Sequence, residues 1–115
     1  MATPTDVTSQ EQLEEEIDAS DSQPVLAYFY SATCPHCRKQ SPVIEEWAEK
    51  ADEAKTIRIQ AQDCLPAFRS HRVLGTPTMI IFSDGEEIAR TSGFQEMGAL
   101  ESWIEENTAE SDTSE

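Results

Sequence analysis

The longest uninterrupted apolar run in this 115-residue chain is Val25–Tyr30, and it is only six residues long. A helix that crosses a bilayer needs about 20 apolar residues and the apolar region of a secretion signal about 7 to 15, so the run predicts neither. Its aromatic and β-branched residues, preceded by Pro24, are typical of a short strand buried on both faces. Such a strand belongs in a sheet that other elements cover on both sides.

Helical and extended patterns alternate along the rest of the chain. Apolar residues spaced three to four apart predict helices at residues 9–20, 35–54, 65–72 and 96–106. Short apolar or alternating runs predict strands at 25–30, 56–61, 78–82 and 87–91, with a hairpin turn at 83–86. Strands separated by helices imply parallel crossovers, and a final hairpin adds an antiparallel strand. We therefore expect an α/β fold with a mixed sheet of four to five strands and helices on both faces.

The length fits one domain, which we place at residues 1–106, followed by an acidic and disordered tail at 107–115. The net charge is −15, and residues 1–22 and 96–115 each hold seven acids and no base. Nucleic-acid binding is poorly supported, because phosphate backbones are bound by Lys and Arg. Solvated helix faces explain the acidic ends; adaptation to a salty cytoplasm is the alternative.

The sequence Cys34-Pro35-His36-Cys37 comes at the end of the first buried strand and opens the long helix. Two cysteines at this spacing on a helix N-terminus can close a small disulfide ring, and the helix dipole stabilises a thiolate on the first. Pro35 suits the first helical position. An imidazole at His36 lowers the pKa of the thiol further and makes the disulfide a better oxidant.

Other uses of paired cysteines fit less well. Haem attachment needs His directly after the second cysteine, where this chain has Arg38. A structural zinc site usually recruits two ligand pairs, and only Cys64 and His71 remain as candidates. Redox chemistry is therefore favoured over a metal site, and we expect no metal and no organic cofactor.

Several motifs occur together at characteristic distances, and their combination resembles the thioredoxin family over residues 7–106. They are the Cys-x-x-Cys pair opening a helix, Pro42, Gly75-Thr76-Pro77 before a strand, Asp84-Gly85 in a hairpin, and Gly93. The resemblance implies the thioredoxin fold, with Pro77 in a cis peptide against the active-site cysteines. It also implies that the Thr76 backbone pairs with substrate and that Gly93 lines the same groove.

The chain departs from the family pattern at several positions. Thr33 stands where most members have Trp, and Pro35-His36 replaces Gly-Pro, as in strongly oxidising DsbA-type proteins. Tyr28 replaces a buried aspartate that serves as the proton acceptor for the second thiol, and Arg58 is the match for its lysine partner. The proton acceptor is therefore an open question.

The function implied is a cytoplasmic, monomeric thiol-disulfide oxidoreductase that reduces protein disulfides through Cys34 and Cys37 and contributes to electron transport and cell redox homeostasis. A thioredoxin reductase is the implied electron donor. Two alternatives remain: a more oxidising disulfide donor or isomerase that uses the Pro-His pair, and a redox-inactive binding or metal-binding module on the same fold. Cys64 is interpreted as an inert buried thiol and His71 as a surface residue.

Overall fold

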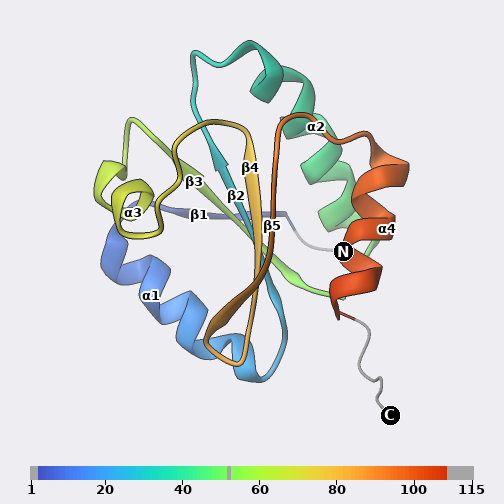
Figure 1. Ribbon diagram of the computed structural model, residues 1–115, viewed down its shortest axis with the longest axis horizontal. Coiled ribbons are helices and arrows are strands. Elements are labelled where there is room, and N and C mark those ends of the chain that lie inside the picture. The colour runs from blue at the N-terminus through green and yellow to red at the C-terminus, as the bar shows by residue number, and fades with distance from the viewer. Residues whose placement is uncertain (1–2, 52, 109–115) are drawn as a thin grey trace.

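The computed structural model describes residues 3–51 and 53–108, which form a five-stranded sheet covered by helices on both faces (Figure 1). The elements in chain order are β1 (Thr5–Val7), α1 (Gln10–Asp18), a 3-10 turn (Ala19–Asp21), β2 (Val25–Tyr30), α2 (Pro35–Lys50), β3 (Lys55–Gln60), α3 (Leu65–Ser70), β4 (Thr78–Ser83), β5 (Glu86–Ser92) and α4 (Met97–Thr108). The strand order is β1-β3-β2-β4-β5. The first three strands in that order are parallel, and β4 is antiparallel to both neighbours. The predicted mixed sheet is confirmed.

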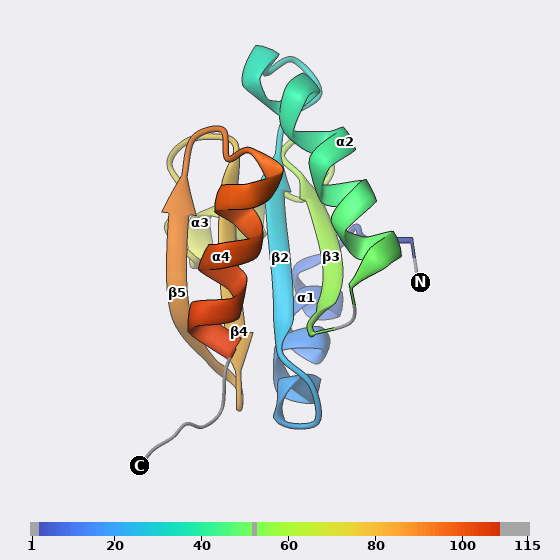
Figure 2. The ribbon, with the colours of Figure 1, turned by 90° about the vertical axis from the view of Figure 1, so that its right-hand side faces the viewer.

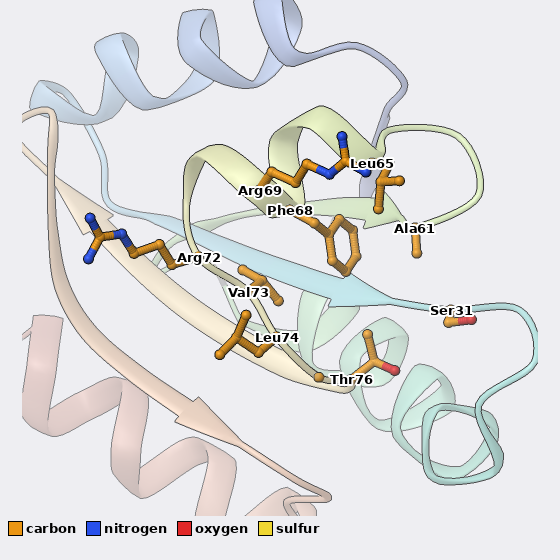
Figure 3. Close-up of a pocket in the computed structure, with 10 residues that line it drawn as sticks. Ser31, Ala61, Leu65, Phe68, Arg69, Arg72, Val73, Leu74 and Thr76 are labelled. Atoms are coloured by element: carbon orange, nitrogen blue, oxygen red, sulfur yellow. The ribbon is translucent and has the colours of Figure 1, made fainter.

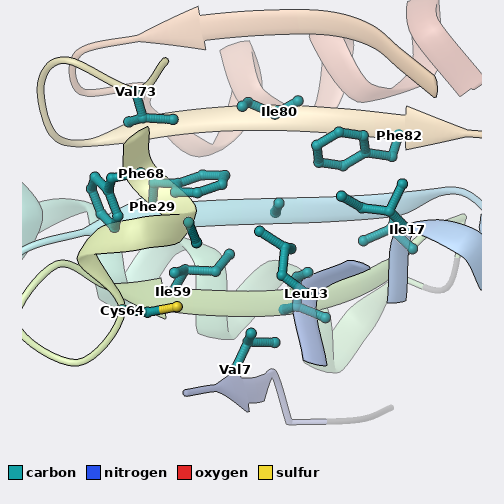
Figure 4. Close-up of a cluster of buried hydrophobic side chains, with 14 residues drawn as sticks. Val7, Leu13, Ile17, Phe29, Ile59, Cys64, Phe68, Val73, Ile80 and Phe82 are labelled. Carbon is teal, nitrogen blue, oxygen red and sulfur yellow. The ribbon is translucent and has the colours of Figure 1, made fainter. Parts of the chain in front are cut away.

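Side chains of the central strand β2 alternate between two hydrophobic cores. Val25, Ala27 and Phe29 face α1 and α3 in the cluster of Figure 4. Leu26 and Tyr28 face the opposite way and pack with Ile44 and Trp47 of α2 and with Leu100 and Ile104 of α4. Figure 2 shows α2 and α4 together on that side of the sheet. Helices on both faces explain why β2 carries apolar residues at every position.

Strand β1 was not predicted. It has three residues, of which only Val7 is buried, so no periodicity marks it. Its partner is β3, with Val7 opposite Ile59. The side chain of Gln12 in α1 donates to the carbonyl of Asp6 at 3.2 Å and accepts from the N–H of Thr8 at 3.1 Å, which ties the strand to the first helix.

The predicted ends of all four helices were wrong by two to four residues; α1 ends at Asp18 and α3 at Ser70, each two residues earlier than predicted. Helix α2 ends at Lys50 instead of residue 54, because the backbone of Ala51 is extended. Helix α4 continues to Thr108, so residues 107 and 108 do not belong to a tail; residues 109–115, where the rest of the predicted tail falls, lie outside the described residues. None of the described helices is long and apolar enough to cross a membrane.

Candidate active site

The two cysteines of the Cys-x-x-Cys sequence lie at the N-terminus of α2, just beyond the end of β2. Cys34 is the N-cap of the helix, and its Sγ accepts the main-chain N–H of Cys37 at 3.2 Å. Pro35 occupies the first turn, where its missing N–H leaves no partner unsatisfied. Cys34 is half-buried, whereas Cys37 is only 2% exposed. The spacing therefore gives one accessible and one shielded thiol.

The surroundings move the pKa values of the two thiols in opposite directions. Burial alone raises the pKa of Cys34, but hydrogen bonds with the Cys37 thiol, with Thr76 and with the backbone of Cys37 and His36 outweigh it, and the net pKa is lowered. Burial raises the pKa of Cys37, and its hydrogen bond with Cys34 raises it further. Cys34 consequently ionises to a thiolate at a lower pH than Cys37 does.

Residues far apart in the sequence meet beside Cys34. The Sγ of Cys34 lies 3.5 Å from the carbonyl oxygen of Thr76, and the Thr76–Pro77 peptide bond is cis, as the resemblance implied. Gly93 donates its N–H to the carbonyl of Pro77 at 2.9 Å and has a φ of +88°, a conformation that favours glycine. The predicted substrate-binding residues Thr76, Pro77 and Gly93 thus lie together at the dithiol.

The imidazole of His36 is exposed and forms no hydrogen bond with any other described residue. The hydrogen bond through which His36 lowers the pKa of Cys34 comes from its backbone N–H, which any residue except proline would provide at this position. An effect of the imidazole itself on the dithiol stays a prediction.

The space behind Cys37 is occupied by Tyr28 on β2. The fully buried Tyr28 hydroxyl donates to the carbonyl of Cys37 at 3.2 Å and lies 2.9 Å from Ser41 Oγ. Burial raises the pKa of Tyr28 far above its usual value, and its contacts with Cys37 and Cys34 add to the shift, while the Ser41 hydrogen bond opposes it. The phenol is therefore neutral near pH 7 and cannot take a proton from Cys37.

Arg58 is opposite Tyr28 in the β2–β3 register, as the family match implied, but its side chain serves another purpose. The guanidinium forms ion pairs with Asp6 at 2.7 Å and Glu45 at 3.1 Å. It therefore links β1, β3 and α2 and does not pair with a buried acid behind the cysteines.

Sequence reasoning missed Gln40, which is fully buried on α2 one turn after Cys37. Its amide donates to the carbonyl of Gln95 at 3.1 Å and accepts the Gln95 N–H at 2.7 Å. This pair connects α2 to the loop that carries Gly93. A buried glutamine on an otherwise apolar helix face was the available signal, because a buried amide requires partners.

The remaining predicted residues lie away from the dithiol. Cys64 is 2% exposed and packs in the core near β1 and β3. His71 is half-buried, with its Nε2 3.0 Å from Glu14, so its interpretation as a simple surface residue was incomplete. Trp47 is buried, whereas Trp103 packs only partly on the same core. In the described part of the chain, no three His, Cys, Asp or Glu side chains come together as metal ligands.

Comparisons with known proteins agree with this geometry. The family model named Thioredoxin matches residues 4–106. The thioredoxin of Mycolicibacterium smegmatis is 39% identical over 82 residues, covering 69% of this chain and 73% of that protein. The structure of a mutant thioredoxin from Halobacterium salinarum superposes with a TM-score of 0.82 at 31% identity, covering 95% of this chain and 96% of that one. The structure of Fasciola hepatica thioredoxin, which is 22% identical, shares the fold with a TM-score of 0.83; the superposition covers 90% of this chain and 98% of that protein's chain.

The fold, the paired cysteines and these relatives define a thiol-disulfide oxidoreductase. The match spans nearly all of the described residues, and the chain belongs to the thioredoxin family.

Proposed function

We propose that this protein reduces disulfide bonds in other proteins, with Cys34 as the nucleophile and Cys37 as the resolving thiol. The observation that carries the proposal is the asymmetry of the pair. Cys34 is accessible and accepts a main-chain N–H, whereas Cys37 is shielded and its pKa is raised. The nucleophile of thiol-disulfide exchange is the thiolate, which favours Cys34 for the first attack.

The exchange proceeds in two steps. The Cys34 thiolate attacks one sulfur of the substrate disulfide, the substrate S–S bond breaks, and the other substrate sulfur leaves as a thiolate. Cys37 then attacks Sγ of Cys34, the mixed disulfide breaks, and the second substrate thiolate leaves. Each leaving thiolate becomes a thiol, one with the proton of Cys37 and one with a proton from water. Two electrons have moved to the substrate, and Cys34 and Cys37 are joined by a disulfide.

The substrate segment is held by the main chain of Thr76, with Pro77 and Gly93 forming the adjoining surface. The carbonyl of Thr76 lies 3.5 Å from Cys34 Sγ. In the described residues the main-chain N–H of Thr76 has no hydrogen-bond partner. A free donor beside the nucleophile can pair with an extended segment that carries the disulfide.

Other parts of the proposal follow from the family. Re-reduction by a thioredoxin reductase restores the dithiol, the exchange itself needs no metal or organic cofactor, and the protein works as a monomer in the cytoplasm. Pro35 and His36 set the reduction potential of the Cys34–Cys37 disulfide. A higher potential would favour donating disulfides to other proteins over reducing them.

Trapping tests the roles of the two cysteines. In Cys37→Ser the second step is blocked, so incubation with disulfide-bonded insulin should leave insulin attached to Cys34 through a mixed disulfide, visible as an added mass that dithiothreitol removes. Cys34→Ser should trap nothing, because the two remaining thiols, Cys37 and Cys64, are both buried. Equal trapping by the two variants, or a wild-type protein unable to reduce insulin in the presence of dithiothreitol, would contradict the proposal.

A further inference from the structure

An apolar pocket extends from Thr76, whose carbonyl lies beside Cys34 Sγ. It has a volume of about 460 Å³ and is lined by residues of α3 and of the segments before and after it, together with Ser31. Figure 3 shows the ring of Phe68 at its centre, Thr76 and Ser31 at one end and Arg72 at the opposite end. A segment that pairs with Thr76 would therefore continue directly into this pocket.

The rim of the pocket exposes large apolar side chains. Leu74 is 97% exposed and Leu65 is 47% exposed, and these are two of the three large hydrophobic residues exposed in the described part of the chain. Two such residues on one pocket beside a reactive site form a contact surface for an apolar side chain of a partner.

The charges on the rim distinguish this pocket from the rest of the surface. The chain carries only eight Lys and Arg against 23 Asp and Glu. Four of these bases, Lys50, Lys55, Arg58 and Arg90, form ion pairs. Arg69 and Arg72 line the pocket, and within the described residues neither guanidinium has a carboxylate partner. Arg38 and Lys39, which follow Cys37 on α2, also have none.

The backbone at Arg72 adds a second observation. Its φ is +56°, in the left-handed region where glycine is the favoured residue. The position follows the end of α3, and the next residue, Val73, donates to the carbonyl of Phe68 at 2.8 Å. Glycine adopts this conformation more readily than arginine does, so the Arg72 side chain can be removed without straining the backbone.

We propose that this pocket selects disulfide partners whose segment next to the disulfide carries an apolar side chain followed by carboxylates. The apolar side chain packs against Phe68 and Leu74, and the carboxylates pair with Arg69 and Arg72. The inference rests on the proposed function and names its preferred substrates. A second copy of this chain is a poor occupant, because two chains of net charge −15 repel each other.

The test compares peptides that contain the same intramolecular disulfide. In one peptide the disulfide loop is flanked on both sides by a leucine and three aspartates. In the second the aspartates are asparagines, and in the third the leucines of the acidic peptide are serines. The wild-type protein should reduce the acidic peptide with a kcat/KM about fivefold above that of the asparagine peptide, the size expected for one or two exposed ion pairs. This preference should disappear near 1 M salt, where the Debye length is about 3 Å and exposed charges are strongly screened.

The variants are chosen to keep the fold. Arg72→Gly places glycine at a left-handed position, and Leu74→Ser changes a side chain that packs on nothing, so neither should lower the melting temperature. Arg72→Gly and Arg69→Gln should each reduce the preference for aspartate, and together they should abolish it. Leu74→Ser should instead reduce the preference for leucine over serine. Lys50→Gln is the control, because it removes one positive charge at the other end of α2.

The outcomes separate this inference from the proposed function. Equal kcat/KM for the aspartate and asparagine peptides, with insulin reduction intact, would overturn the pocket assignment and leave the reductase proposal standing. Loss of preference in Lys50→Gln as large as in Arg72→Gly would also overturn it, since net charge would then explain the effect. The inference would also be overturned if the wild-type protein sediments as a dimer and the Leu74→Ser variant as a monomer, because a second copy of the chain would then occupy the pocket.

Discussion

The hydroxyl oxygen of Tyr28 lies 2.9 Å from Ser41 Oγ, and the two groups fill the space behind Cys37 with a pair of neutral hydroxyls. Because the phenol also donates to the carbonyl of Cys37, it fixes the first turn of α2 against β2. Tyr28 therefore has a structural role behind Cys37 and does not serve as a proton acceptor. The proton of Cys37 has to leave by another route, and the departing substrate thiolate is the base that the reaction itself supplies.

Tyr28→Phe should destabilise the protein without stopping the reaction. The variant loses one buried and one partly buried hydrogen bond, which together contribute about 1–3 kcal/mol to the free energy of unfolding. Urea denaturation measures this loss, and Tyr30→Phe is the matched control, because its half-buried hydroxyl has only a 3.4 Å contact with Gln60. Insulin reduction by Tyr28→Phe should stay within a few fold of wild type. A large loss of turnover in the folded variant would show that the phenol takes part in proton transfer.

The two thiols should alkylate with well-separated pH profiles. The pKa of Cys34 is lowered, so its thiolate persists as the pH falls and its reaction with iodoacetamide should slow only below the usual thiol pKa of about 8.5. The pKa of Cys37 is raised, so its reaction should begin only above that pH and should also be slowed by burial. Mass spectrometry of peptides from the reduced protein distinguishes the sites. Identical profiles would contradict the assigned roles.

His36→Gly should make the disulfide harder to reduce. If the imidazole stabilises the Cys34 thiolate by about one pKa unit, which is about 1.4 kcal/mol, its removal shifts the potential by roughly 30 mV in the negative direction. The backbone hydrogen bond from residue 36 is retained in the variant, so the shift isolates the side chain. Equilibration with glutathione gives the potential. No shift would mean that the exposed imidazole has no effect on the dithiol, and a positive shift would reverse its assigned role.

Cys64→Ala should leave turnover within a few fold of wild type. Cys64 is buried in the core on the α1 and α3 side of the sheet, whereas Cys37 lies in the first turn of α2, where its carbonyl accepts the Tyr28 hydroxyl. Removing the buried sulfur leaves a small cavity, with a cost on the order of 1 kcal/mol. Thermal unfolding measures that cost, and an insulin assay measures turnover. Inactivity of a fully reduced and folded variant would instead assign the third thiol to the exchange.

The sequence alone predicted the layers of the fold and the reactive pair, because both depend on local patterns. The run Val25–Tyr30 indicated a strand covered on both faces, and the structure places helices there. The helix N-terminus at Cys34 follows from Pro35 and the periodic apolar residues after it. Asp84 and Gly85 indicated the hairpin, and both have positive φ values.

Tertiary structure decided what depends on contacts between distant segments. Strand β1 forms because its residues pair with β3, with Val7 opposite Ile59. A segment of three residues carries no sequence pattern from which this pairing could be predicted. The hydrogen bonds of Tyr28, the Gln40–Gln95 connection and the distance from Cys34 to Thr76 join residues from 9 to 55 positions apart. The pocket between α3 and Leu74 follows from the same folding, as do its two arginines, which form no ion pair with any residue that the structure describes. Composition showed a strongly acidic chain, and only the fold showed which of its bases form ion pairs and that Arg69 and Arg72, which have no carboxylate partner among the described residues, line one pocket.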